Sequence, residues 1–121
     1  MEKEFVSYEI ALALKELGFD EPCLMVYNYK KQVILNNKIP YKERTNQPNP
    51  YLCTAPLKQQ VFRWFREKYE LIYFIGDDFG GWSYSVSKNS KIQGSISNVY
   101  KTYEETELGC INKLIEIVKN K

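Results

Sequence analysis

The sequence predicts an α+β fold in which three helices pack on an antiparallel sheet of four to five strands, in the order α-ββ-α-βββ-α. Apolar residues recur at helical spacing in three segments, and short apolar or alternating runs between them have the period of strands. Turn residues join these runs, which is typical of antiparallel hairpins. Residues 54–88 are the most informative segment, because an amphipathic stretch, an apolar run, a glycine turn and an alternating run follow one another there.

The first helix is bounded by two signals. Ser7 can cap its N-terminus through the side-chain oxygen, and Gly18 suits the left-handed position that ends a helix. A turn at residues 20–22 follows. Residues 23–29 and 32–35 are then apolar enough to predict two short strands that form a hairpin.

A long loop and a second helix come next. Residues 36–53 show no periodicity and contain three prolines, which predicts an irregular connection. Thr54 is predicted to cap the second helix, with Pro56 in the first turn, where its missing N–H costs nothing. The apolar face of this helix consists of Leu57, Val61, Phe62, Trp64, Phe65 and Tyr69. Three basic residues lie outside that face, namely Lys58, Arg63 and Arg66.

Three strands are predicted between the second and third helices. Residues 71–75 are apolar at every position, so we expect a central strand that is covered on both faces. Residues 82–87 alternate between large apolar residues and serine, which predicts one packed face and one wet face. The glycine-rich residues 77–81 between them predict a hairpin turn. Residues 92–97 predict a weaker strand, loosened by Gly94.

The last helix has a capping box at its start. Thr102 and Glu105 have the T-x-x-E spacing in which the two residues satisfy free amides of the first turn. Gly109 lies in the middle of this helix and weakens it by about 1 kcal/mol relative to alanine, unless a close contact requires glycine. The apolar stripe consists of Ile111, Leu114, Ile115 and Val118.

Length and composition predict one domain over residues 1–121, in a soluble protein of the cytoplasm. The net charge of +2 is far from the strongly basic balance of a general phosphate-backbone binder. Three widely spaced cysteines without a CxxC motif indicate neither a zinc site nor a disulfide framework, and they fit a reducing compartment. No signal peptide is visible, and no apolar run reaches the roughly 18 residues that a membrane span needs.

The residue types argue against enzymatic activity and indicate no cofactor. The chain has no histidine, the commonest general base and a frequent zinc ligand. Glycines match neither of the phosphate-binding motifs GxGxxG and GxxxxGK[ST]. Asp77 and Asp78 could hold Mg²⁺ if a third oxygen ligand converged on them. The same residues also fit a simple hairpin turn, and this alternative is the one we expect.

A binding surface is the favoured site. Tyrosines near the long loop, together with a cation, could line a groove for a protein, peptide or small-molecule partner. The residues proposed for it are Tyr27, Tyr29, Tyr41, Arg44 and Tyr51. The alternative is nucleic-acid binding through Lys58, Arg63 and Arg66, although these also fit a solvated helix face on which Arg63 pairs with Glu67.

Helix, three strands and helix from Ala55 onward also follow the element order of double-stranded RNA-binding domains. In that family the final helix opens with lysines that bind phosphates. Residues 102–107 of this chain are acidic where the family is basic, so RNA would be repelled there.

The chain also resembles a family of small uncharacterised proteins of gut bacteria and their phages. The resemblance rests on SYEIALALKELGFDEPC (7–23), TAPLKQQVFRWFREKYELI (54–72) and YKTYEETELGCINKLIEIV (100–118). It covers nearly the whole chain except residues 36–53, and Thr106 stands where alanine is common in the family. The resemblance implies no catalytic residues. It implies a cytoplasmic accessory protein of a prophage or other mobile element, and we therefore expect a non-enzymatic binding or interaction module.

Overall fold

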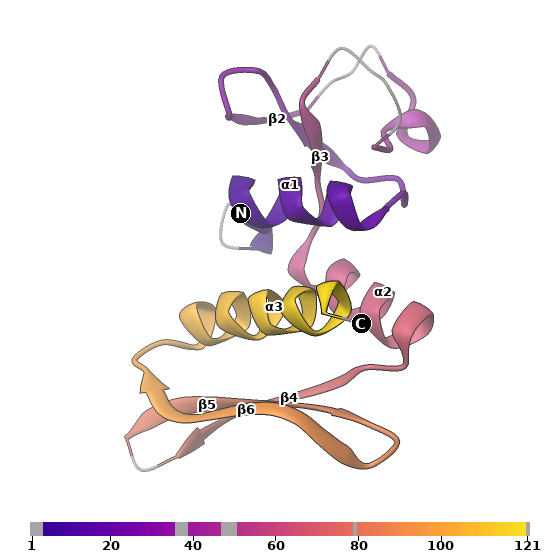
Figure 1. The fold of residues 1–121 in the computed structure, drawn as a ribbon. Coiled ribbons are helices and arrows are strands. Elements are labelled where there is room, and N and C mark those ends of the chain that lie inside the picture. Colours follow the sequence, from indigo (N-terminus) through magenta and orange to yellow (C-terminus); the bar gives the residue numbers. More distant parts are fainter. Residues whose placement is uncertain (1–3, 36–38, 47–50, 79, 121) are drawn as a thin grey trace. The chain divides into compact units, whose positions relative to one another are not determined.

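The α+β class and the predicted order of elements are confirmed in a computed structural model. The structure describes residues 4–35, 39–46, 51–78 and 80–120. Over these residues it contains three α-helices, a short 3-10 helix and six strands (Figure 1). The strands form two antiparallel sheets of three, with the orders β2-β1-β3 and β4-β5-β6, instead of the single sheet expected.

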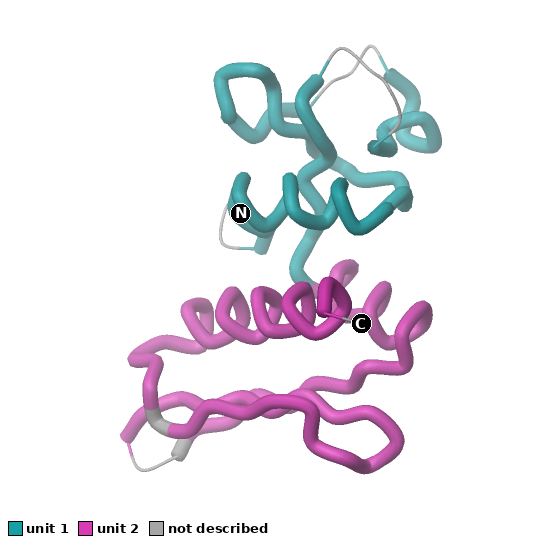
Figure 2. The backbone as a smooth tube through the Cα atoms, in the orientation of Figure 1, with its two compact units in different colours: residues 1–58 teal, residues 59–121 magenta. Residues whose placement is uncertain are grey.

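The chain divides into two compact units, residues 1–58 and residues 59–121 (Figure 2). Each unit has its own sheet. The single domain expected from chain length stays a prediction, and the two units are described separately below.

Helix α1 (Tyr8–Leu17) of the first unit begins and ends as predicted. The Ser7 hydroxyl accepts a hydrogen bond from the amide of Ile10 at 3.4 Å. Gly18 ends the helix with a φ of 94°, the left-handed conformation for which glycine is favoured. The buried face of α1 consists of Ile10, Ala11 and Leu14.

The sheet of the first unit has β1 (Met25–Tyr27) at its centre, between β2 (Val33–Ile34) and β3 (Cys53–Ala55). β1 and β2 form the predicted hairpin, although both strands are shorter than expected. In its turn, the side-chain oxygen of Asn28 accepts hydrogen bonds from the amides of residues 30 and 32, at 2.9 and 3.0 Å.

β3 was missed, and the expectation that Thr54 caps the second helix is wrong. Thr54 pairs with Val26 of β1, and α2 (Lys58–Tyr69) begins four residues later. Threonine suits both a cap and a strand. Pairing with β1 decides between the two, and such a long-range contact is not visible in the local pattern.

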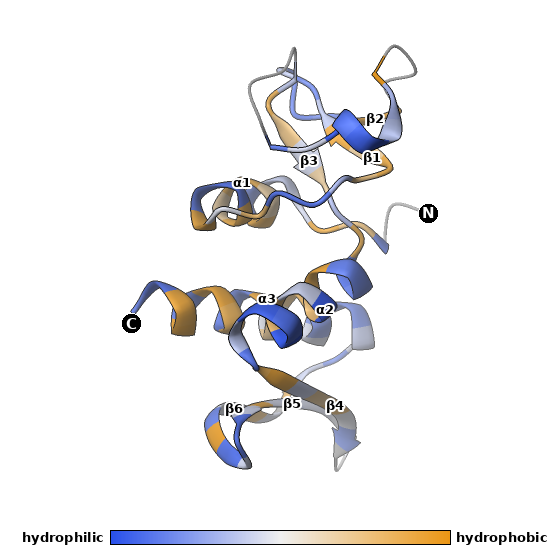
Figure 3. Ribbon diagram, turned by 90° about the vertical axis from the view of Figure 1, so that its right-hand side faces the viewer, coloured by the Kyte–Doolittle hydropathy of each residue, from blue (hydrophilic) through white to orange (hydrophobic). Residues whose placement is uncertain are grey.

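The second unit is a helix layer on one face of a sheet. Its strands are β4 (Ile72–Asp78), β5 (Gly81–Lys88) and β6 (Lys91–Tyr100), and α3 (Tyr103–Lys119) follows them. α2 and α3 lie on the same side of this sheet (Figure 3). Tyr84 and Val86 of β5 are buried on the helix side, as the alternating pattern predicted.

The expectation that residues 71–75 form a central strand covered on both faces is wrong. β4 is an edge strand, and β5 takes the centre because it belongs to both hairpins. Tyr73 lies on the helix side, where its ring stacks on Phe62 with the centroids 3.8 Å apart. The opposite face is uncovered in the part of the chain described, so Ile72 and Phe74 are 55% and 67% exposed.

The turn between β4 and β5 and the start of α3 agree with the sequence. Asp78 pairs with Gly81, and Gly80 between them has a φ of 84°; Phe79 lies outside the described residues. Thr102 caps α3 and accepts from the amide of Glu105 at 3.1 Å.

A close contact explains the glycine in the middle of α3. A Cβ atom at Gly109 would overlap the hydroxyl of Tyr100. Glycine at this position therefore allows the end of β6 to approach the helix.

Candidate functional site

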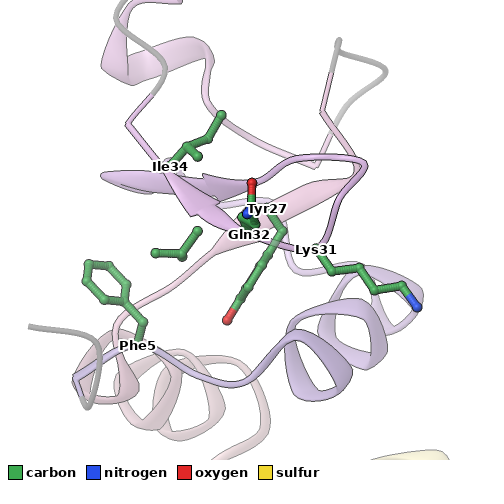
Figure 4. Close-up of a pocket in the computed structure, with 6 residues that line it drawn as sticks. Phe5, Tyr27, Lys31, Gln32 and Ile34 are labelled. Carbon is green, nitrogen blue, oxygen red and sulfur yellow. The ribbon is translucent and has the colours of Figure 1, made fainter.

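An open pocket of about 510 Å³ lies beside the β1–β2 hairpin of the first unit (Figure 4). Four of its six described lining residues are apolar or aromatic and the other two, from the hairpin, are polar, while polar atoms make up the larger part of its accessible surface. Sites for small molecules commonly combine apolar walls with a few polar groups. The lining residues are Phe5, Tyr27, Lys31, Gln32, Val33 and Ile34.

Two aromatic walls are fixed by contacts with the start of the chain. Phe5 forms an isolated antiparallel bridge with Leu57, and the next amide, that of Val6, donates to the carbonyl of Pro56 at 3.1 Å. The hydroxyl of Tyr27 donates to the carbonyl of Val6 at 2.6 Å. Because this hydroxyl is occupied, Tyr27 contributes its ring to the pocket as an apolar surface.

The two polar lining residues differ in what they offer a ligand. Gln32 accepts a hydrogen bond from the Asn28 amide at 3.3 Å, and its own Nε2 has no partner among the described residues. Lys31 is exposed, and its ammonium lies 5.1 Å from the centre of the Tyr8 ring, directed away from Phe5 (Figure 4). The pocket therefore offers apolar side chains and one available amide donor, and its described lining residues include no carboxylate or thiol.

The five residues proposed for a tyrosine-rich groove lie in different settings, and only Tyr27 lines the pocket. Tyr29, in the hairpin turn, is 69% exposed. Tyr51 is 4% exposed, and its hydroxyl donates to the carbonyl of Thr45 at 2.5 Å. Tyr51 is therefore part of the core of the first unit.

Tyr41 and Arg44 lie together, and their contacts join described residues of the loop to the segment before β1. Tyr41 opens the 3-10 helix η2 (Tyr41–Glu43), and the Arg44 guanidinium carbon is 5.9 Å from the centre of its ring. Arg44 donates to the carbonyls of Leu24 at 2.7 Å and Ile39 at 2.9 Å. These hydrogen bonds use the guanidinium for structure and leave it less available to a ligand.

The three basic residues proposed for nucleic acid do not share an exposed face. Lys58 is only 4% exposed, which corrects the expectation that it lies on the solvated side of the helix. It begins α2 directly after the segment that pairs with Phe5, where the chain is buried. Arg63 and Arg66 are exposed, and the predicted pairing is present, with Arg63 Nε 3.9 Å from Glu67 Oε1.

The proposed acidic pair lies at the end of β4. Asp77 is exposed and pairs with Trp82 in the β4–β5 ladder, and the backbone of Asp78 pairs with Gly81. The side chain of Asp78 lies outside the described structure. Across the described residues, no three histidine, cysteine, aspartate or glutamate side chains gather as a metal site.

The three cysteines are buried thiols that form no disulfide in the structure described. Burial raises the pKa of Cys53 to about 11 and that of Cys110 to about 12, in the latter case with a further contribution from Glu107. The thiolate is the reactive form, so at neutral pH both groups are unreactive thiols.

Five of the six pocket residues were missed from the sequence. Gln32, Val33 and Ile34 were expected only as residues of a short strand, and Lys31 as part of the preceding turn. Phe5 lies 22 residues before Tyr27 and precedes the first helix, so no local pattern links the two. The short hairpin was the available signal, because exposed hairpin residues often border binding sites.

None of the helices that the structure describes combines the length and the hydrophobicity of a membrane-spanning segment. Comparisons with protein-family models, with curated proteins and with solved structures give no match to this chain.

Proposed function

We propose that this protein is a non-enzymatic binding module whose ligand occupies the pocket beside the β1–β2 hairpin. The observation that carries the proposal is an open volume of about 510 Å³ that combines apolar side chains with a mostly polar surface and an available side-chain amide on Gln32. Burial of an apolar ligand against Phe5, Val33 and Ile34 would supply the affinity. Gln32 would supply orientation by donating to an acceptor on the ligand.

The chemistry of the lining favours binding over catalysis. Tyr27 uses its hydroxyl in an internal hydrogen bond, and the lining residues that the structure describes include no pair of groups that could exchange a proton with a substrate. The buried thiols Cys53 and Cys110 hold their protons at neutral pH. The ligand class that fits is a small molecule, or a peptide side chain, that combines an apolar part with a carbonyl acceptor.

The proposed setting is the cytoplasm of a bacterium, as an accessory protein of a phage or other mobile element. Three buried cysteines that keep their thiols support a reducing compartment. The resemblance of residues 7–23, 54–72 and 100–118 to the family of small proteins from gut bacteria and their phages supports the mobile-element context.

Nucleic-acid binding is the alternative proposal, and exposed Arg63 and Arg66 are the observation in its favour. It would now rest on two arginines, because Lys58 is buried. Metal-assisted catalysis at Asp77 and Asp78 is the other alternative, and exposed Asp77 is the residue available to it.

The proposal can be tested with two probes that differ in one feature. Benzamide carries a carbonyl acceptor on an aromatic ring, and toluene is nearly the same size without the acceptor. We expect benzamide to shift the amide signals of Gln32, Val33 and Ile34 in ¹H–¹⁵N spectra, and toluene to shift them less.

A pair of variants supplies the control. Ile34→Trp fills the pocket and should abolish the shifts, whereas Leu35→Trp adds the same ring at the adjacent position, which is 51% exposed and does not line the pocket. Equal binding to both variants, or no shift with either probe, would contradict the proposed site.

A further inference from the structure

The sheet edges of this protein differ in how well they are protected against pairing with another strand. An exposed edge presents unpaired N–H and C=O groups, and proteins block such edges with short strands, bulges, charges or covering groups. In the first unit, β2 has only two residues. On β3, the side-chain oxygen of Asn46 accepts from the amide of Thr54 at 2.8 Å. Both edges of this sheet therefore have a protective feature.

The two edges of the second sheet are not alike. β6 has two irregularities in its register with β5, a glycine at position 94 and exposed Lys91 at its start. β4 pairs with β5 one residue to one residue, from Ile72 to Asp78, with no register shift. β4 also has no proline, no lysine and no strand on its outer side among the described residues. It is the longest regular edge that the structure describes.

The side chains of β4 suit a fourth strand. Ile72 and Phe74 are 55% and 67% exposed on the face away from the helices. They stand across from Ser87 and Ser85 of β5, which are small and half-buried. A strand added beside β4 would place its own alternating side chains next to Ile72 and Phe74 and bury their exposed sides. We propose that the outer edge of β4 binds an extended peptide as a fourth strand, at a surface distinct from the hairpin pocket.

Charge at the two ends of β4 selects the partner. Glu70 precedes the strand and Asp77 lies near its end, and both are exposed. A peptide with lysine or arginine at its ends and apolar residues at alternate positions between them matches this pattern. A second copy of this chain matches it poorly, because antiparallel pairing of two β4 strands brings Glu70 of each copy towards Asp77 of the other, and like charges across strands are destabilising.

The test uses the full ¹⁵N-labelled chain and three synthetic peptides. The first is acetyl-Lys-Val-Thr-Val-Thr-Val-Lys-amide. The second replaces both lysines with glutamate. The third keeps the lysines and has N-methyl groups on alternate residues, so that one edge of the peptide cannot donate hydrogen bonds. The readouts are amide shift changes and hydrogen-exchange protection over residues 72–78.

We expect the first peptide to shift and protect β4 amides, with little effect on β6. The acidic peptide should bind about tenfold more weakly, since it replaces two favourable exposed charge pairs with unfavourable ones. If the N-methylated edge of the third peptide faces β4, that peptide should not bind, because the methyl groups have replaced the hydrogen-bond donors of this edge. Phe74→Lys should weaken binding, and Ile92→Lys, at a residue 70% exposed on β6, is the matched control that should not.

Three results would overturn the inference. Absent shifts, or shifts centred on β6 or on the first unit, would remove β4 as the docking edge. Equal binding of the basic and acidic peptides would remove the cationic partner. Concentration-dependent shifts of β4 without any peptide, with a dimer in sedimentation, would assign the edge to a second copy instead.

Discussion

Asn46 is expected to be the most important polar side chain of the first unit. Its oxygen accepts from the amide of Thr54 at 2.8 Å, and its Nδ2 donates to the carbonyl of Phe19 at 2.9 Å. One side chain thus joins the long loop, the edge of β3 and the segment after α1. Thr54 is fully buried, so water cannot replace the hydrogen bond to its amide.

Asn46→Ala should lower the free energy of unfolding by about 2–4 kcal/mol. The lost hydrogen bond to the carbonyl of Phe19 costs roughly 0.5–1.5 kcal/mol, and the buried Thr54 amide left without a partner costs about 1–3 kcal/mol. Urea unfolding followed by far-UV circular dichroism measures this loss. Both tryptophans, at positions 64 and 82, lie in the second unit, so their fluorescence would not report directly on this site.

Two further variants make the result specific. Asn46→Asp keeps an acceptor for the Thr54 amide but loses the donor to Phe19, so Thr54 should stay protected from hydrogen exchange in this variant and lose protection in Asn46→Ala. Asn112→Ala, at an exposed position of α3, is the control and should change stability little. If Asn46→Ala unfolds at the same urea concentration as the parent, the role given to Asn46 is wrong.

Three other substitutions have defined outcomes. Thr54→Val should leave the free energy of unfolding unchanged or raise it by about 1–2 kcal/mol, because Thr54 Oγ1 is buried without a partner among the described residues. A decrease of more than about 1 kcal/mol in urea unfolding would show that the hydroxyl is hydrogen-bonded. Gly109→Ala should lower the free energy of unfolding by about 1–2 kcal/mol despite the better helix propensity of alanine, because the Tyr100 ring must move. Gly94→Ala is the control and should have little effect, because the added Cβ would meet only the flexible side chain of Lys113. A Gly109→Ala variant that is more stable than the parent in thermal unfolding would refute this. Burial raises the pKa of Cys110 from 9.0 to about 12, so the folded state holds the thiol proton where the unfolded chain releases it, and stability falls as pH rises. Between about pH 8 and about pH 10 this group should contribute a loss of roughly 1 kcal/mol that Cys110→Ala removes, and identical pH profiles of parent and variant would contradict it.

Features set by local chemistry were predictable from the sequence. Ser7, Gly18 and Thr102 mark the ends of helices through contacts within a few residues, and all three lie where expected. The turn between β4 and β5 was predictable for the same reason, since glycine supplies the positive φ at position 80. In these cases the sequence neighbours are also the spatial neighbours.

Features set by distant contacts were not predictable. Thr54 lies in a strand because Val26, 28 residues earlier, pairs with it. Residues 71–75 resemble a central strand in composition, but the helices cover only one face and leave Phe74 exposed. The pocket has the same origin, because it combines Phe5 with a hairpin more than 20 residues away.

The most direct test of the proposed binding function is to locate a bound ligand by intermolecular nuclear Overhauser effects. With a methyl-labelled chain and benzamide, we predict contacts from the ligand ring to the methyl groups of Val33 and Ile34 and to the ring of Phe5. Contacts to the exposed methyl groups of Ile72 or Ile92 in place of these, or no contacts at all, would contradict a binding site in the hairpin pocket.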